Sequence, residues 1–82
     1  MSSITFWEAM YQVMESGLWA RLPGWPVVIR LNDQLGEMYL YDFMARRWLI
    51  PYMPTKTDLY ETSWEYVSAK EAEKESRAQS QD

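Results

Sequence analysis

The stretch TFWEAMYQVMESG (Thr5–Gly17) decides the fold class, because it has the pattern of one helix and the residues after it do not. Thr5 and Glu8 match a capping box, in which the hydroxyl accepts a hydrogen bond from the backbone of the third helical residue. Gly17 is a natural helix end. The stretch therefore predicts an amphipathic helix, and its apolar stripe comprises Phe6, Ala9, Met10, Val13 and Met14.

After Gly17 the chain changes to runs rich in aromatic and β-branched residues, which favour strands. The connections are short, so antiparallel pairing is expected. Residues 32–36 (NDQLG) carry turn residues and predict a hairpin. We therefore expect an α+β fold, with the N-terminal helix packed on a small antiparallel sheet of about four to five strands. The predicted strands are Leu18 to Arg21, Val27 to Asn32, Glu37 to Phe43, Arg47 to Tyr52 and Trp64 to Ser68.

Aromatic residues are more numerous than so small a core can easily hide. The 82 residues include five Trp, six Tyr and two Phe, and a domain of this size buries only about 60% of the surface that its unfolded chain exposes. Trp7 and Tyr11 lie four residues apart and off the helical stripe. These two rings either widen the buried face of the helix or pack on a neighbouring subunit.

Residues 69–82 differ in composition from the rest of the chain. They are charged and poor in aliphatic side chains, and Glu73 and Arg77 are spaced to support a transient helix. We therefore expect a single domain, residues 4–68, followed by a flexible or frayed charged tail, residues 69–82.

Composition disfavours several classes of function. The formal net charge is -4, whereas binding to polymeric DNA or RNA relies on many Lys and Arg residues that neutralise phosphates. The chain has neither His nor Cys, which removes the commonest general base and the thiolate nucleophile or metal ligand. We expect a protein that is not an enzyme and uses no metal or other cofactor.

Membrane and export signals are also missing from the sequence. The start Met1-Ser2-Ser3 lacks the basic residues of a signal peptide. No apolar run approaches the roughly 18 residues that span a bilayer. We expect a cytoplasmic protein without a membrane partner.

Two blocks combine residue types that suit the capture of a small anionic ligand. In Ala20-Arg21-Leu22-Pro23-Gly24-Trp25, a Pro-Gly turn allows Arg21 and Trp25 to flank one concavity. Arginine matches a phosphate with a planar fork of donors, and tryptophan offers a face to a base. In the second block, residues 54–58, Thr57 and Asp58 can bond ribose hydroxyls or a base edge. The candidate ligand-binding residues are Arg21, Trp25, Trp48, Tyr52, Thr57 and Asp58.

The order of these features resembles the phage Thoeris anti-defence proteins of the second type. The shared order is an amphipathic helix ending in Gly, then Ala-Arg ahead of Gly-Trp, then Asp58-Leu59 with Trp64 six residues after the aspartate. The resemblance covers residues 5–67. This chain departs from the family pattern by one extra residue between Arg21 and Gly24, by Pro26 after the Trp, and by Ser63 in place of an aspartate.

The resemblance implies a sponge, a protein that sequesters the cyclic nucleotide signals of bacterial immunity without cleaving them. The implied ligands are cyclic ADP-ribose isomers and cyclic oligonucleotides. The resemblance also implies a homo-oligomer, a tetramer or dimer, with ligand pockets between protomers. Two alternatives stay open: a small inhibitor that binds a host enzyme through its aromatic surface, and an aromatic sheet that stacks single-stranded nucleic acid, which the acidic composition disfavours.

Overall fold

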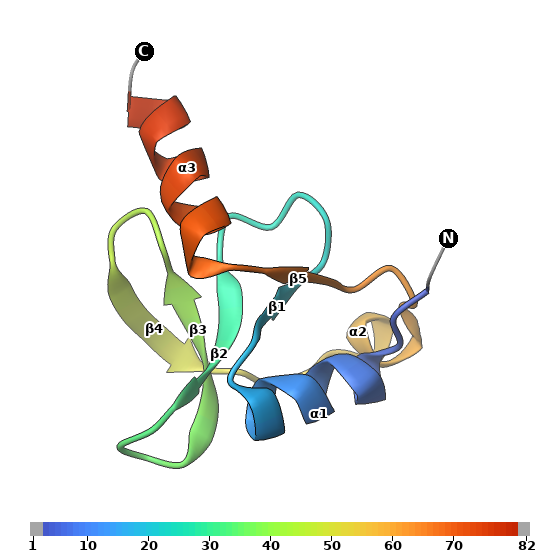
Figure 1. Cartoon of the computed structure of the whole chain (residues 1–82). Helices are drawn as coiled ribbons and strands as arrows, with labels where there is room; N and C mark the ends of the chain where they lie inside the picture. The colour runs from blue at the N-terminus through green and yellow to red at the C-terminus, as the bar shows by residue number, and fades with distance from the viewer. Residues whose placement is uncertain (1–2, 81–82) are drawn as a thin grey trace.

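The computed structural model describes residues 3–80, with side chains through residue 75, and shows three helices and one sheet (Figure 1). The sheet has the strand order β4-β3-β2-β1-β5, and all four strand pairings are antiparallel. This confirms the predicted α+β fold with an N-terminal helix on an antiparallel sheet. In chain order the elements are α1 (Phe6–Ser16), β1 (Trp19–Arg21), β2 (Val28–Asn32), β3 (Glu37–Asp42), β4 (Arg47–Pro51), α2 (Lys56–Tyr60), β5 (Glu65–Val67) and α3 (Ala69–Ser80).

Helix α1 begins and ends where the sequence predicts. Thr5 Oγ1 accepts a hydrogen bond from the Glu8 backbone N–H at 3.3 Å. Gly17 ends the helix with a φ of 69°, a left-handed conformation that favours glycine. Met14, the last residue of the predicted stripe, is exposed. The other four stripe residues are buried in a core with three residues of the sheet side, so that this core comprises Phe6, Ala9, Met10, Val13, Ala20, Ile29 and Trp64.

The pairing of β2 with β3 places alternate side chains on opposite faces of the sheet. Ile29 pairs with Leu40, and both pack in the core beneath α1. The predicted hairpin between these strands forms, because Asn32 Oδ1 accepts hydrogen bonds from the backbone of the turn and Gly36 takes a φ of 70°.

The other face of the sheet carries a second, smaller core in which α3 takes part. Its buried residues are Val28, Phe43, Val67 and Ala72. We call this side of the sheet, which carries Trp19, Tyr41 and Phe43, the aromatic face, and because Ala72 lies on α3, this helix covers part of it. The two helices thus pack on opposite faces of one sheet.

The helical state of residues 69–80 differs from the frayed tail that the sequence predicts. Ser68 Oγ accepts a hydrogen bond from the Glu71 backbone N–H at 3.0 Å and so caps the helix. Ala72 is small enough to approach the sheet closely, and Glu75 pairs with Arg21. In a sequence, a docked helix is usually recognised by a stripe of large apolar side chains. Helix α3 docks through an alanine and an ion pair, which give no such pattern.

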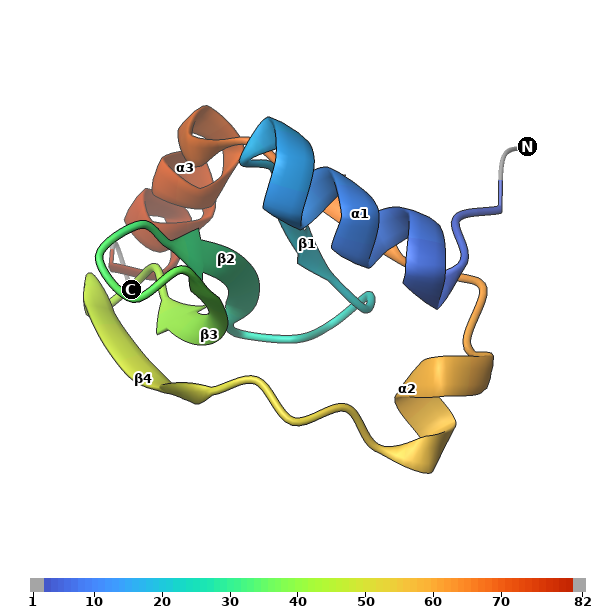
Figure 2. The ribbon, with the colours of Figure 1, turned by 90° about the horizontal axis from the view of Figure 1, so that it is seen from below.

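Residues 56–60, which overlap the second block, lie outside the helix and strands that the sequence predicts. They form the short helix α2, which begins with a reciprocal capping box between Thr55 and Asp58. Figure 2 shows α2 at the far end of the extended segment that leads from β4, beside the start of α1.

The two aromatic residues off the α1 stripe are exposed and do not widen its buried face. Trp7 is 72% exposed and Tyr11 is 62% exposed. Met14 on the helix and Leu18, just after its end, are exposed as well. Among residues 3–80, no helix is long and apolar enough to cross a membrane.

Candidate ligand-binding site

The connection between β1 and β2 carries the first predicted block and fixes the position of Trp25. The Trp25 backbone N–H donates to the Leu22 carbonyl at 3.2 Å, and Gly24 has a φ of 88°, which favours glycine. The Trp25 ring meets the buried ring of Trp64 edge to face, with 5.6 Å between centroids. The core therefore holds this half-buried indole in one orientation.

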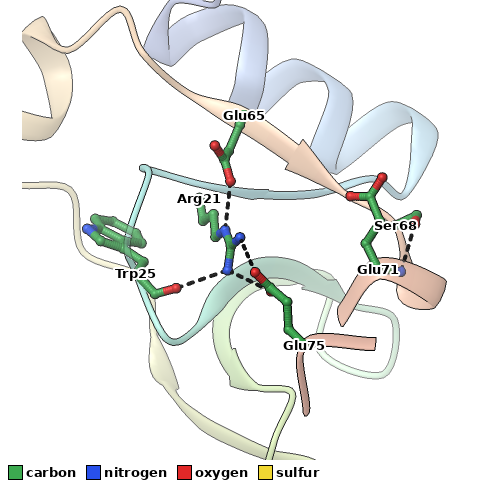
Figure 3. A network of polar contacts seen from close by, with 6 residues as sticks. All are labelled: Arg21, Trp25, Glu65, Ser68, Glu71 and Glu75. Atoms are coloured by element: carbon green, nitrogen blue, oxygen red, sulfur yellow. Dashed lines mark hydrogen bonds and ion pairs between the residues drawn. The ribbon is translucent and has the colours of Figure 1, made fainter. Parts of the chain in front are cut away.

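Arg21, at the end of β1, is the centre of a polar network that joins three parts of the fold (Figure 3). Its Nε donates to Glu65 on β5 at 2.9 Å. Its two terminal nitrogens donate to the two carboxylate oxygens of Glu75 on α3, at 3.1 and 3.0 Å. Nη1 also donates to the Trp25 backbone carbonyl at 3.1 Å. The carbonyl of Trp25, rather than its ring, faces the guanidinium.

These contacts stabilise the positive charge of Arg21. Hydrogen bonding to Glu75 raises the pKa of the guanidinium; burial opposes this effect, and Glu65 adds to it. The side chain is only 13% exposed. Arg21 is therefore a permanent cation whose fork of donors already holds a carboxylate inside the same chain.

A pocket of about 410 Å³ lies beside this network. We call it the Arg21 pocket. Its lining comes from the end of β1, the β1–β2 connection, the residues after β3, and Glu75 of α3. The lining residues are Arg21, Gly24, Trp25, Pro26, Phe43, Met44 and Glu75.

Tyr52 and Asp58 form a second polar contact, where the segment after β4 meets α2. The Tyr52 hydroxyl donates to Asp58 Oδ2 at 2.8 Å, and the Thr55 backbone N–H donates to the same oxygen at 3.2 Å. Asp58 is only 7% exposed. Burial, followed by the hydrogen bond to Asp58, raises the pKa of Tyr52 far above its ordinary value. The phenol is therefore held as a neutral donor.

A pocket of about 330 Å³ opens between this contact and the β1–β2 connection. We call it the Tyr52 pocket. Its lining residues are Trp25, Pro26, Val27, Leu40, Tyr52, Met53 and Asp58. Trp25 and Pro26 line both pockets and so form a common wall.

The structure brings together four of the six candidate residues, Arg21, Trp25, Tyr52 and Asp58, around this common wall. Thr57 is exposed on α2 and lines neither pocket. Trp48 lies elsewhere, on the aromatic face of the sheet, where its ring packs on Tyr41 with 5.1 Å between centroids. In the single chain, Trp48 and Thr57 therefore lie apart from the other four candidate residues.

Trp48 belongs to a cluster that sequence reasoning missed. The Arg30 guanidinium lies 4.5 Å from the ring centroids of Trp19 and Tyr41, and 4.7 Å from that of Trp48. Cation–π contacts of this kind cover part of the aromatic face that α3 leaves open. The sequence shows that Tyr39, Tyr41 and Arg30 alternate toward one face of their strands. It does not show that four strands bring aromatic rings together around Arg30.

The acidic partners of Arg21 were also missed. Arg21 and Glu65 are direct cross-strand partners, so an opposite-charge pair between β1 and β5 is a detectable signal once these strands are paired. Glu75 gives no such signal, because its contact depends on where α3 docks.

Among residues 3–80, no group of three or more acidic side chains is arranged to hold a metal ion. Comparison with known proteins adds no relative: no family model, curated protein or solved structure matches this chain. Its function therefore has to be inferred from its own residues and geometry.

Proposed function

We propose that this protein is a phage anti-defence sponge that binds cyclic nucleotide immune signals and hides them from the host without cleaving them. The observation that carries the proposal is the Trp25–Pro26 wall, which has the Arg21 pocket, with its guanidinium, on one side and the Tyr52 pocket, with its hydroxyl and carboxylate, on the other. A ring, a cation and sugar-compatible polar groups within one small region suit a nucleotide.

The roles of the residues follow from their chemistry. Trp25 stacks a base, Arg21 pairs with a phosphate, and Asp58 accepts hydrogen bonds from ribose hydroxyls or a base edge. Tyr52 acts by position, because its neutral hydroxyl orients Asp58. Tyr52 is a poor general base, since burial and Asp58 keep its proton in place. These groups favour tight binding over bond cleavage.

Pocket size and exposed apolar surface support assembly as part of the function. The two pockets, about 410 and 330 Å³, lie near the lower end of the range for small-molecule sites. A second protomer against the exposed α1 stripe, a homodimer or homotetramer, encloses the ligand further. The proposed setting is the cytoplasm of the infected bacterium.

The direct test is binding followed by recovery of the ligand. Purified protein is titrated calorimetrically with a cyclic ADP-ribose isomer and with a cyclic dinucleotide, and the complex is then heated and its ligand is chromatographed. We expect saturable binding of one ligand class and release of the intact molecule. Steady appearance of a linear product, or no binding of either class, contradicts the proposal.

A second candidate function rests on the exposed aromatic residues of α1. Trp7 and Tyr11 are the kind of residues that dominate protein–protein hot spots, so the chain can instead block a host enzyme by contact. Trp7→Ala distinguishes the two functions. The inhibitor loses its host partner in a pull-down while the Tyr52 pocket stays intact, whereas a sponge that keeps its assembly keeps its ligand.

A further inference from the structure

Glu75 binds the Arg21 guanidinium in the geometry that an anionic ligand would use. Both carboxylate oxygens of Glu75 accept from the two terminal nitrogens of the guanidinium, at 3.1 and 3.0 Å. This is the two-point arrangement that arginine also makes with phosphate. Glu75 also lines the Arg21 pocket. A phosphate that reaches Arg21 by its fork must therefore take the place of this carboxylate.

Besides this ion pair, helix α3 packs on the sheet through a small apolar core. Through residue 75 its one buried side chain is Ala72, which packs in this core with Val28, Phe43 and Val67. The Glu75 side chain is 44% exposed, so its ion pair contributes modestly. Release of α3 uncovers this small core and breaks a half-exposed ion pair but leaves the larger core beneath α1 closed, so it costs less than unfolding of the sheet.

Two groups keep Arg21 in place when α3 leaves. Glu65 holds Nε at 2.9 Å from the neighbouring strand, and the Trp25 carbonyl holds Nη1. Glu65 lies on β5 opposite Arg21 in the sheet and not on α3. The guanidinium thus stays aimed at the pocket, with the nitrogens that Glu75 vacates presented to the ligand.

We propose that α3 is a displaceable latch, in which Glu75 is an internal anion that a phosphate-bearing ligand replaces on Arg21, so that ligand binding releases α3 from the sheet. The latch rests on the proposed function as far as the natural ligand is concerned. The exchange of one anion for another at Arg21 does not require that ligand and is tested separately. By linkage, a change that loosens α3 strengthens ligand binding by the same factor.

Inorganic pyrophosphate is a suitable probe, because it carries the required anion and no base. Hydrogen exchange of the backbone amides of residues 69–75 reports on α3, and calorimetry reports affinity. In the unaltered protein we expect saturating pyrophosphate to accelerate exchange in α3 while the amides of β2 and β3 stay protected. Unchanged protection of α3 at saturation, or absence of pyrophosphate binding, overturns the latch.

Glu75→Gln and Glu71→Gln form a matched pair of variants. Each removes one negative charge from α3 and keeps a good helix former, but only Glu75 contacts Arg21 in the described structure. We expect Glu75→Gln to bind pyrophosphate about tenfold more tightly than Glu71→Gln, a coupling in the usual allosteric range. Equal affinities overturn the latch, because a general charge effect then explains the result.

The same design separates failure of the latch from failure of the sponge. If pyrophosphate releases α3 but cyclic nucleotides do not bind, the latch stands and the proposed function is wrong. If a cyclic nucleotide binds with no change in α3 exchange, the sponge stands and the latch is wrong.

Discussion

The Arg21 Nη1 atom lies 3.1 Å from the Trp25 backbone carbonyl, so the residue expected to hold a phosphate also holds the loop that carries the expected stacking ring. The two candidate residues are therefore coupled through the backbone. Loss of Arg21 affects binding twice, by removing a cation and by loosening the loop.

Arg21→Ala should destabilise the fold. The variant removes the centre of a network that joins β1, β5 and α3 (Figure 3), and leaves the half-exposed carboxylates of Glu65 and Glu75 without their shared cation. We expect a loss of about 1 to 3 kcal/mol in the free energy of unfolding, measured by urea denaturation. Arg47→Ala, at an exposed position of β4, is the control and should cost less than about 0.5 kcal/mol. Equal losses in the two variants would show that the network contributes nothing.

Trp25→Ala should weaken ligand binding, and Trp48→Ala should not. Trp25 lines both pockets, whereas Trp48 packs against Tyr41 and Arg30 on the aromatic face. We expect Trp25→Ala to lose about 1 to 3 kcal/mol of binding free energy with little dependence on salt. Calorimetry on the folded variants measures both effects. A larger loss for Trp48→Ala would move the site to the Arg30 cluster.

Tyr52→Phe and Asp58→Asn should show strong coupling in a double-mutant cycle. The hydroxyl and the carboxylate are 2.8 Å apart, and Asp58 is buried. We expect a coupling free energy of unfolding of about 1.5 to 3 kcal/mol, as for a hydrogen bond to a charged group. Thr57→Ala, on the same short helix but outside both pockets, should be close to neutral in stability and in ligand affinity. Additive effects of the first two variants would contradict the contact.

Alkaline pH should reduce stability through Tyr52. Burial and the hydrogen bond to Asp58 raise the pKa of the folded phenol above its ordinary value of 10.0. The unfolded chain loses this proton near that pH and the folded chain keeps it, so the folded state binds more protons and loses stability as the pH rises above about 10. Below that pH the contribution is fully present.

Thermal unfolding of the unaltered protein and of Tyr52→Phe between pH 9 and pH 11 tests whether stability falls with rising pH through Tyr52. The variant should show a shallower decline, although not a flat one, because burial also raises the pKa of Tyr66. Tyr60→Phe, at an exposed position of α2, should leave the decline unchanged. A decline in Tyr52→Phe as steep as that of the unaltered protein would rule out this source.

Local patterns were enough to predict most of the fold. The Thr5–Glu8 cap, Gly17 and the spacing of the apolar residues specify α1 within the sequence itself, and the alternation in residues 28–43 specifies the hairpin. These signals depend on residues a few positions apart. Two helices, at residues 56–60 and 69–80, are less evident from local patterns, because Asp58 and Glu75 contact residues outside their own helices, Tyr52 and Arg21.

The candidate site could be predicted only in part for the same reason. Arg21 and Trp25 are close in sequence, and a turn between them is enough to place both at one pocket. Nothing local reveals that Glu65 and Glu75 neutralise Arg21, or that Trp48 faces the side of the sheet away from Tyr52. Strand order and the docking of α3 determine both facts.

Self-association should depend on the exposed stripe of α1. Trp7 and Tyr11 lie one helical turn apart and are largely exposed, an arrangement that a monomer of this size rarely leaves uncovered. We expect a dimer or tetramer at micromolar concentration, and we expect Trp7→Glu to give the monomer, because a buried unpaired charge is costly at an interface. Leu35→Glu, which changes an exposed apolar residue in the β2–β3 turn, should leave the assembly unchanged. Light scattering coupled to size exclusion measures the masses. A monomeric unaltered protein would refute assembly and, with it, any pocket shared between subunits. An assembly that tolerates Trp7→Glu would place the interface elsewhere, and the apolar edge strand β4 would be the next surface to test.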